Sequence, residues 1–347
     1  MELSVMFFGA DTAETQHRQT YDDILAIARQ ADRLGFHALW TPERHFQQVG
    51  QVFPSPPVLS AALAVATERI GIRAGSVVLP LHHPLRVVED WAVVDNLSHG
   101  RIGISAATGW HSTDFILSPD SYADRRERTL RDIPLLRRLW KGEAAQFRDG
   151  AGELTPVRPQ PRPVQQTLPL WMTSSGNPQT WEAAGQLRTG VLAGTVGQTR
   201  DEIADKIGRY RAACDAAPDQ DGVGPEGHVT LMAHTYVGTS DEEVRQLVAA
   251  PLKAYLQSYL RQTSANRSGD PRDAELTSEQ TAMLTEFAFR RHLTWGSLLG
   301  SVQTCRKMLA DLRDLGVDEV ACFIDFGLGA DHVRAGLQRL AELRKDF

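Results

Sequence analysis

The sequence predicts a single (β/α)8 barrel over residues 1–347, on three observations. Short apolar runs alternate with longer amphipathic segments along the chain, which is typical of repeated strand–helix units around a parallel sheet. The runs that resemble strands number eight, as a closed barrel requires. No G-x-G-x-x-G follows the first run, which argues against a doubly wound dinucleotide-binding sheet.

The first half of the chain supplies four strand–helix units. Its apolar runs predict strands at residues 3–8, 37–40, 70–79 and 101–107. The amphipathic segments predict helices at residues 21–35, 56–67, 84–100 and 124–142. The second of these helices begins with proline, and the first and third end at Gly35 and Gly100. Proline at the first turn and glycine after the last turn are typical helix boundaries.

The second half supplies the remaining four units. Strands are predicted at residues 168–174, 189–194, 228–238 and 318–327, and helices at residues 177–187, 199–214, 240–262, 301–315 and 330–345. The prolines of residues 153–169 favour an extended surface connector. Residues 261–281 are polar and rich in turn formers, which predicts an insertion loop between the seventh and eighth strands. A loop there can cover the C-terminal mouth of a barrel, so we expect a lid.

Composition indicates a soluble globular enzyme, with 42% hydrophobic and 23% charged residues. A formal net charge of −6 offers no basic field for nucleic acid or an anionic membrane. No apolar run reaches the roughly 18 residues of a membrane span, and no basic segment precedes the first strand, so we expect a cytoplasmic protein. The three cysteines are far apart, which favours buried thiols over a disulfide framework or a zinc site.

Functional residues of a barrel lie just past the C-terminal ends of its strands. The segments in those positions are residues 7–11, 41–46, 80–84, 107–115, 173–180 and 194–198. Among them, TSSGNPQT (173–180) follows a strand and opens a helix. Backbone N–H groups and the helix dipole at such a place favour a phosphate. An ordinary capped helix start has the same residue types, and both interpretations stay open.

The histidines do not define a metal site. His82 and His83 are adjacent and point apart, and the stretch HSTD (111–114) has no third ligand at a suitable spacing. A single histidine on a loop, such as His45 between Arg44 and Phe46, is more often structural than catalytic. The sequence contains no G-x-S-x-G elbow and no P-loop. Composition and spacing therefore indicate a barrel enzyme with a phosphate-bearing ligand.

Several motifs, taken in series, resemble the bacterial luciferase-like flavin monooxygenases, in particular the subgroup associated with polyketide and nonribosomal peptide assembly lines. These motifs are GFHALWTPERHF, AGSVVLPLHHPLRVVEDWAVVDNLSHGRIGIS, YADRRERT and LPLWMTSSGNPQTWEAAG. They occur in the family's order and cover the chain nearly end to end. The resemblance implies a luciferase-like TIM barrel and a homodimer formed through residues 56–67 and 84–97, whose surfaces are largely apolar.

The resemblance also implies a cofactor, reduced FMN, delivered by a separate flavin reductase. The phosphate would lie at Ser174, Ser175, Gly176 and Asn177, approached by Tyr122 and Arg126. The flavin ring would lie against Phe8, Gly9, Gly75, Ser76, Ala107 and Thr108. The family has a non-proline cis peptide at the place that matches Gly75–Ser76, beneath the flavin.

One residue departs from the family pattern. Arg44 occupies the position of the proposed catalytic histidine, while the next histidine, His45, is kept. A guanidinium stays charged and does not shuttle protons. We therefore expect His45 to handle the proton and Arg44 to hold an anion: a flavin peroxide, a substrate carboxylate or a phosphate.

The function implied by the resemblance is oxygenation of a small organic or carrier-protein-tethered biosynthetic intermediate, with reduced FMN and O2 giving a flavin hydroperoxide. Two alternatives stay open. One is a deazaflavin-dependent dehydrogenase on the same fold, and the other is a non-catalytic flavin-binding subunit. His45 and the long polar loop favour an enzyme over the second alternative.

Overall fold

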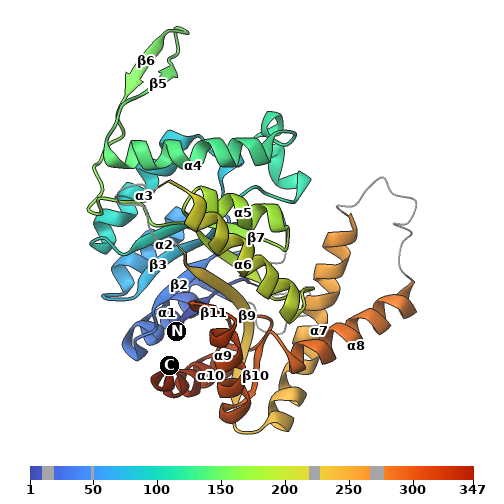
Figure 1. The fold of residues 1–347 in the computed structure, drawn as a ribbon. Coiled ribbons are helices and arrows are strands. Elements are labelled where there is room, and N and C mark those ends of the chain that lie inside the picture. The colour runs from blue at the N-terminus through green and yellow to red at the C-terminus, as the bar shows by residue number, and fades with distance from the viewer. Residues whose placement is uncertain (10–18, 48–50, 219–226, 266–276) are drawn as a thin grey trace.

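The computed structural model describes residues 1–9, 19–47, 51–218, 227–265 and 277–347. Eight parallel strands close into a barrel, and helices surround it (Figure 1). Around the barrel the strands follow in the order β1 (Glu2–Met6), β2 (Ala38–Thr41), β3 (Gly71–Val78), β4 (Ile102–Ala107), β7 (Leu170–Ser174), β8 (Gly190–Gly194), β9 (Val229–Gly238) and β11 (Glu319–Phe323). Pairing of β11 with β1 closes the sheet, so the predicted barrel is confirmed.

All the α-helices of the described residues except α8 (Ser278–Thr294), which was not predicted, begin and end close to the predicted positions. The others are α1 (Tyr21–Leu34), α2 (Pro56–Ala66), α3 (Pro84–Ser98), α4 (Arg125–Lys141), α5 (Pro178–Gln186), α6 (Arg200–Ala216), α7 (Asp241–Ala265), α9 (Val302–Asp314) and α10 (Ala330–Leu343). Capping explains the boundaries: Thr20 and Thr199 form capping boxes, and Gly35 ends α1 with φ of 77°. Within the described ranges, no helix is both long and apolar enough to cross a bilayer.

Residues 145–157 form an antiparallel hairpin that the sequence analysis missed. Its strands are β5 (Ala145–Arg148) and β6 (Leu154–Val157), and it projects away from the barrel (Figure 1). Asp149 accepts hydrogen bonds from the backbone N–H groups of Ala151 and Glu153 and so stabilises the turn. The extended connector predicted for residues 153–169 therefore begins with a paired strand.

The polar segment 261–281 is more helical than predicted. Helix α7 continues to Ala265, and α8 starts at Ser278 with a capping box between Thr277 and Gln280. Serine, threonine and glutamine are typical of turns and also of helix starts, which is why the segment resembled one loop. The expected lid falls mostly on residues 266–276, outside the described residues. A further strand, β10 (Leu298–Ser301), pairs with β9.

The N-terminal end of the barrel is filled by a buried carboxylate and its donors. Glu319 of β11 accepts hydrogen bonds from Ser4, Trp40, Arg73, His228 and Thr230. Although burial acts in the opposite direction, the charges of Arg73 and His228 and these hydrogen bonds hold the Glu319 pKa far below its usual range. An apolar layer of Met6, Trp171, Leu192 and Ala321 lies in the barrel interior. The filled N-terminal end leaves the opposite, C-terminal mouth as the place for a ligand, as is usual in barrels of this kind.

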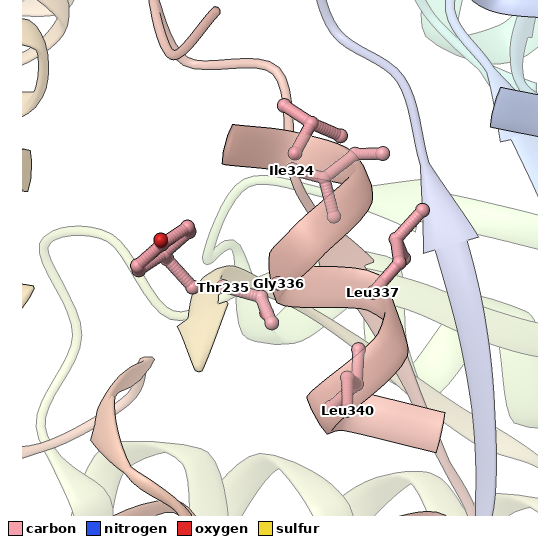
Figure 2. Close-up of a pocket in the computed structure, with 7 residues that line it drawn as sticks. Thr235, Ile324, Gly336, Leu337 and Leu340 are labelled. Atoms are coloured by element: carbon pink, nitrogen blue, oxygen red, sulfur yellow. The ribbon is translucent and has the colours of Figure 1, made fainter. Parts of the chain in front are cut away.

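A small cavity lies on the outer side of the barrel wall, between β9 and α10 (Figure 2). Thr235, Tyr236, Ile324, Val333, Gly336, Leu337 and Leu340 line it. Its lining is mostly aliphatic and contains no acid, base or nucleophile other than hydroxyl groups. We regard it as imperfect packing between a helix and the sheet, away from the mouth.

Candidate active site

The mouth of the barrel has an aromatic half, built by β1, β9 and β11 with α7. The Phe8 and Phe323 ring centroids are 4.8 Å apart, and the His234 ring lies 4.5 Å from Phe323 and 4.7 Å from Tyr255. Burial lowers the pKa of His234 well below its usual value, so this histidine is neutral. The rings of this half are therefore uncharged and largely apolar, which suits a flat heterocycle or an aromatic substrate.

The other half of the mouth carries hydroxyl groups from β3, β4 and β7. The Thr173 Oγ1 lies 2.5 Å from Ser76 Oγ and 2.6 Å from Ser105 Oγ. The peptide between Gly75 and Ser76 is cis, which confirms that prediction. A Cβ on Gly75 would lie 3.0 Å from the Trp40 ring and 3.2 Å from Leu192. Only glycine fits there without displacing the layer beneath.

The end of β1 is held by a carboxylate that the sequence analysis did not identify. Asp325, just after β11, accepts hydrogen bonds from the backbone N–H groups of Phe8 (2.7 Å) and Gly9 (2.8 Å). These bonds fix the chain where Phe8 turns toward the mouth. The residues predicted to contact the flavin ring thus lie at or just past the ends of β1, β3 and β4, on one side of the barrel. They are Phe8, Gly9, Gly75, Ser76, Ala107 and Thr108.

The predicted phosphate turn joins β7 to α5. Asn177 caps the helix by accepting a hydrogen bond from Gln179 N–H, and Gly176 N–H donates to Ser174 Oγ at 3.3 Å. Gly176 has φ of 126°, a conformation that favours glycine. Ser175 and Asn177 are exposed. The turn therefore presents small polar side chains and a helix start to the mouth, although Asn177 is already used as an ordinary cap.

A buried lysine lies behind this turn and was missed by the sequence analysis. Lys206 of α6 donates a 2.5 Å hydrogen bond to Gln198 Oε1, and this oxygen would lie 3.4 Å from a Cβ on Gly176. Gln198 belongs to the segment 194–198, which had been selected for its position after a strand. Its partner lies on the helix that follows directly, but Lys206 belongs to no motif that had been selected.

Tyr122 and Arg126 lie in the segment that leads into α4. The Tyr122 ring packs edge-on against Phe115, with centroids 4.9 Å apart, and the Arg125 guanidinium lies over it at 4.4 Å. Arg126 is partly buried, and its guanidinium makes no hydrogen bond or ion pair with another described residue. No hydrogen bond between described residues joins Tyr122 or Arg126 to the turn at 174–177. Arg126 is thus available for an anion.

His45 is oriented by a buried glutamate. Its Nε2 lies 2.9 Å from Glu43 Oε1, which also contacts His82 Nε2 at 2.7 Å, while Glu43 Oε2 accepts the Val78 N–H. Burial raises the Glu43 pKa, but the hydrogen bonds from His45 and His82 outweigh it and lower that pKa. Burial lowers the pKa of His82, yet the bond and charge of Glu43 raise it overall. A histidine fixed by a carboxylate is the usual arrangement of a general acid–base.

Arg44 extends over Phe8 of the aromatic half. Its guanidinium carbon lies 4.1 Å from the Phe8 ring centroid, within the range of a cation–π contact. Burial lowers the pKa of Arg44, and the charges of Tyr255 and Asp114 act in the opposite direction. The residue nevertheless stays cationic, because an arginine pKa lies far above neutrality. Its side chain has no hydrogen-bonding partner among the described residues.

His111 and Asp114, weighed in the sequence only as metal ligands, are near Arg44. His111 precedes the 3-10 helix Ser112–Leu117 after β4, Asp114 lies within that helix, and both residues are 6% exposed. His111 Nε2 and Asp114 Oδ1 have no hydrogen-bond partner among the described residues. Burial lowers the pKa of His111 to about 4, and burial raises that of Asp114 to about 6 against the charges of His45 and Arg44.

Metal-binding geometry is absent from the described part of the chain, where no three His, Cys, Asp or Glu side chains are arranged to hold an ion. Cys214, Cys305 and Cys322 are buried thiols outside any disulfide, as the sequence indicated.

Fold and mouth together define a barrel enzyme whose polar and aromatic groups converge at the carboxyl ends of the strands. A family model described as luciferase-like monooxygenase matches residues 1–319. The chain therefore belongs to the luciferase-like monooxygenase family, as its motifs indicated.

Two relatives have known activities. The oxygenase component of a flavin-dependent trigonelline monooxygenase from Acinetobacter baylyi is 28% identical over 330 residues, covering 93% of this chain and 88% of that protein. The 4-hydroxyprotoasukamycin monooxygenase of Streptomyces nodosus subsp. asukaensis is 26% identical over 293 residues, covering 84% and 76%. Among solved structures, monooxygenase RslO1 from Streptomyces bottropensis superposes with a TM-score of 0.79 at 22% identity, covering 99% and 98% of the chains. That likeness shows the fold.

Proposed function

We propose that the protein is the oxygenase component of a two-component monooxygenase that uses reduced FMN and O2 to oxygenate a small organic or carrier-protein-bound intermediate. The observation that carries the proposal is the turn at 174–177, a glycine-dependent helix start at the mouth of a barrel in this family. The oxygenase component named among its relatives supports a separate flavin reductase as partner.

The residues at the mouth fit FMN. The turn Ser174–Ser175–Gly176–Asn177 offers a helix N-terminus for the phosphate, and the unpaired Arg126 offers a positive charge. The cis peptide Gly75–Ser76 and the small residues Gly9 and Ala107 at the ends of β1 and β4 supply backbone that the ring can approach. Tyr122 stays assigned to the phosphate side on the family resemblance.

When bound, the reduced cofactor supplies the reaction with O2. The protein supplies orientation, exclusion of water and a placed proton. His45, fixed by Glu43, is the group that moves the proton. Arg44 cannot transfer a proton near neutrality and holds negative charge instead. The aromatic half of the mouth excludes water around both groups.

A homodimer formed through α2 and α3 is part of the proposal. Helix α2 contains no charged residue, and Val58 and Val65 on it are 71% and 69% exposed. Val93 and Leu97 of α3 are 44% and 42% exposed. A helix that is apolar around its circumference usually packs on both sides.

Reoxidation of the flavin tests the proposal. Photoreduced FMN is mixed with aerated buffer, with and without excess protein, and the absorbance of oxidised flavin is followed. We expect the absorbance of oxidised flavin to reappear at least about tenfold more slowly with protein than without, equivalent to about 1.4 kcal/mol in activation free energy. Arg126→Met should weaken the effect, and the exposed Arg131→Met should not. Unchanged reoxidation, or hydride transfer with a deazaflavin cofactor in place of FMN, would contradict the proposal.

A further inference from the structure

Arg44 and Arg126 differ from the other partly buried arginines in the described ranges. Arg73 pairs with Glu319, Arg101 donates to Ile70 O, and Arg137 donates to Leu187 O. The guanidinium groups of Arg44 and Arg126 have no such partner there. An unpaired buried cation is costly, so each of the two predicts an anion supplied by a ligand.

Arg126 is accounted for by the phosphate side of the proposed cofactor site, and Arg44 is not. Arg44 lies on the opposite, aromatic half, over Phe8. Its charge acts on Tyr255 of α7, His111 and Asp114. The carboxylate of Asp114 forms no ion pair with it, and neither Asp114 Oδ1 nor His111 Nε2 has a described partner. The Arg44 guanidinium thus lies close enough for its charge to act on two other polar groups, His111 Nε2 and Asp114 Oδ1, that have no hydrogen-bond partner among the described residues.

The charges nearby restrict the anion to a single negative charge. Glu43 is a buried carboxylate in the same segment, and Asp114 adds a second one. A phosphate dianion would be repelled by both, whereas a carboxylate matches the planar fork of a guanidinium with two parallel hydrogen bonds. Aromatic side chains are available for the body attached to that carboxylate. Phe8 and Tyr255 have ring centroids 6.0 Å apart, and the ring of Trp110 lies 3.6 Å from that of the neighbouring His111.

Building on the proposed function, we propose that Arg44 is the specificity-determining anchor for a substrate that carries a carboxylate on a flat, aromatic body. The carboxylate binds the guanidinium, and the ring lies between the aromatic side chains of β1, α7 and the turn after β4. When it is ionised, the Asp114 carboxylate competes with the substrate carboxylate for the positive charge of Arg44. Binding is therefore strongest when Asp114 is protonated.

The sign of the pH effect follows from the surroundings of Asp114. Arg44, His45 and Glu43 face it from the segment after β2, and His111 belongs to its own turn. Its pKa is raised to about 6, while a benzoate-type carboxylate with an ordinary pKa near 4 stays ionised above about pH 5. Lowering the pH from about 8 to about 5.5 neutralises Asp114 and should strengthen carboxylate binding.

The test uses benzoate, its neutral analogue benzamide and acetate as probes, titrated calorimetrically into the full-length protein with and without FMN. We expect benzoate to bind at least about tenfold more tightly than either of the others, a difference of about 1.4 kcal/mol. Arg44→Met should remove that preference, and Arg44→Lys should retain only part of it. Asp114→Asn should bind benzoate more tightly at about pH 8 and lose the pH dependence.

Controls separate this site from the cofactor site. The Arg131→Met variant changes an exposed arginine and should bind benzoate as the parent does. The Arg126→Met variant should bind FMN more weakly and benzoate with unchanged affinity. Circular dichroism checks that each variant is folded. Equal binding of benzoate and benzamide, equal binding of benzoate and acetate, or parent-like benzoate binding by Arg44→Met would each overturn the proposal. Loss of FMN binding alone would overturn the proposed function and not the carboxylate site.

Discussion

Buried carboxylates of this protein have two kinds of surroundings. Glu319 at the closed end of the barrel accepts five hydrogen bonds, from Ser4, Trp40, Arg73, His228 and Thr230. Asp114 at the mouth has an oxygen with no described partner. A buried carboxylate whose oxygens have hydrogen-bond partners within the protein indicates a structural role. A buried polar atom without such a partner indicates a place for a ligand or water.

Replacing Glu319 with Gln should therefore destabilise the fold. The change leaves the buried Arg73 guanidinium without its counter-charge, which typically costs about 3–5 kcal/mol. Because the folded-state pKa of Glu319 is depressed, its contribution is complete above the unfolded pKa of about 4.3 and is lost as the pH falls below it. Urea unfolding at neutral and acidic pH measures both effects: the gap between parent and variant should narrow in acid.

The exposed Glu286 provides the matched control. It pairs with Lys253 and Arg290 on the surface, so Glu286→Gln should change stability by less than about 0.5–1 kcal/mol. If Glu319→Gln unfolded at the same urea concentration as the parent, the network would not stabilise the barrel.

Residue identities at the mouth were partly predictable from the sequence. His45, Arg44 and Gly176 belong to short motifs at strand ends, where position alone indicates function. Glu43 stands beside them, but its bonds to His82 and Val78 depend on a second loop. Asp325 acts on Phe8 and Gly9 at the other end of the chain. That contact follows from barrel closure, which no local pattern records, whereas Lys206 binds the nearby Gln198 through the start of α6.

Among the elements, the turn between β7 and α5 depends most on one residue. Gly176 has φ of 126°, and a larger side chain would also displace Gln198 from its contact with Lys206. Gly176→Leu should weaken FMN binding at least about tenfold, or about 1.4 kcal/mol, because the backbone at the helix start must move. Equilibrium dialysis measures the affinity.

A second glycine controls for backbone strain alone. Gly152 in the β5–β6 turn also has positive φ, at 86°, and open space around its Cβ position. Gly152→Leu should leave FMN affinity unchanged. Should Gly176→Leu bind FMN as well as Gly152→Leu does, the phosphate lies elsewhere.

Element boundaries were predictable where apolar periodicity and caps agreed. The eight barrel strands and the helices around them satisfy both criteria. The β5–β6 hairpin has only a half-buried face, with Ala145 and Phe147 packed against the core, and Leu154 on it is 61% exposed. Its hydrophobic pattern is therefore weak. Helix α8 exposes Met283 and Phe287 and follows a polar stretch, which hides its start.

At the scale of the whole molecule, α2 and α3 expose apolar side chains that the packing of the described residues does not cover. Val58 and Val65 lie seven residues apart on one face of α2, and Val93 and Leu97 lie four apart on α3. The two helices pack against each other, so these side chains are placed to form a continuous patch. Patches of this kind mark contacts with another protein surface.

The proposed homodimer predicts that a charge on this patch separates the subunits. Light scattering at micromolar concentration should give twice the chain mass of 38.3 kDa for the parent. The double variant Val58→Asp, Val93→Asp should give the single mass, because burying two unpaired carboxylates in an apolar interface costs several kcal/mol. Leu154→Asp places the same charge on an equally exposed residue of the hairpin and should remain dimeric. A monomeric parent would show that α2 and α3 meet some other partner. A dimeric double variant would place the contact between subunits on a different face, leaving the apolar patch as a surface for the reductase or a carrier protein.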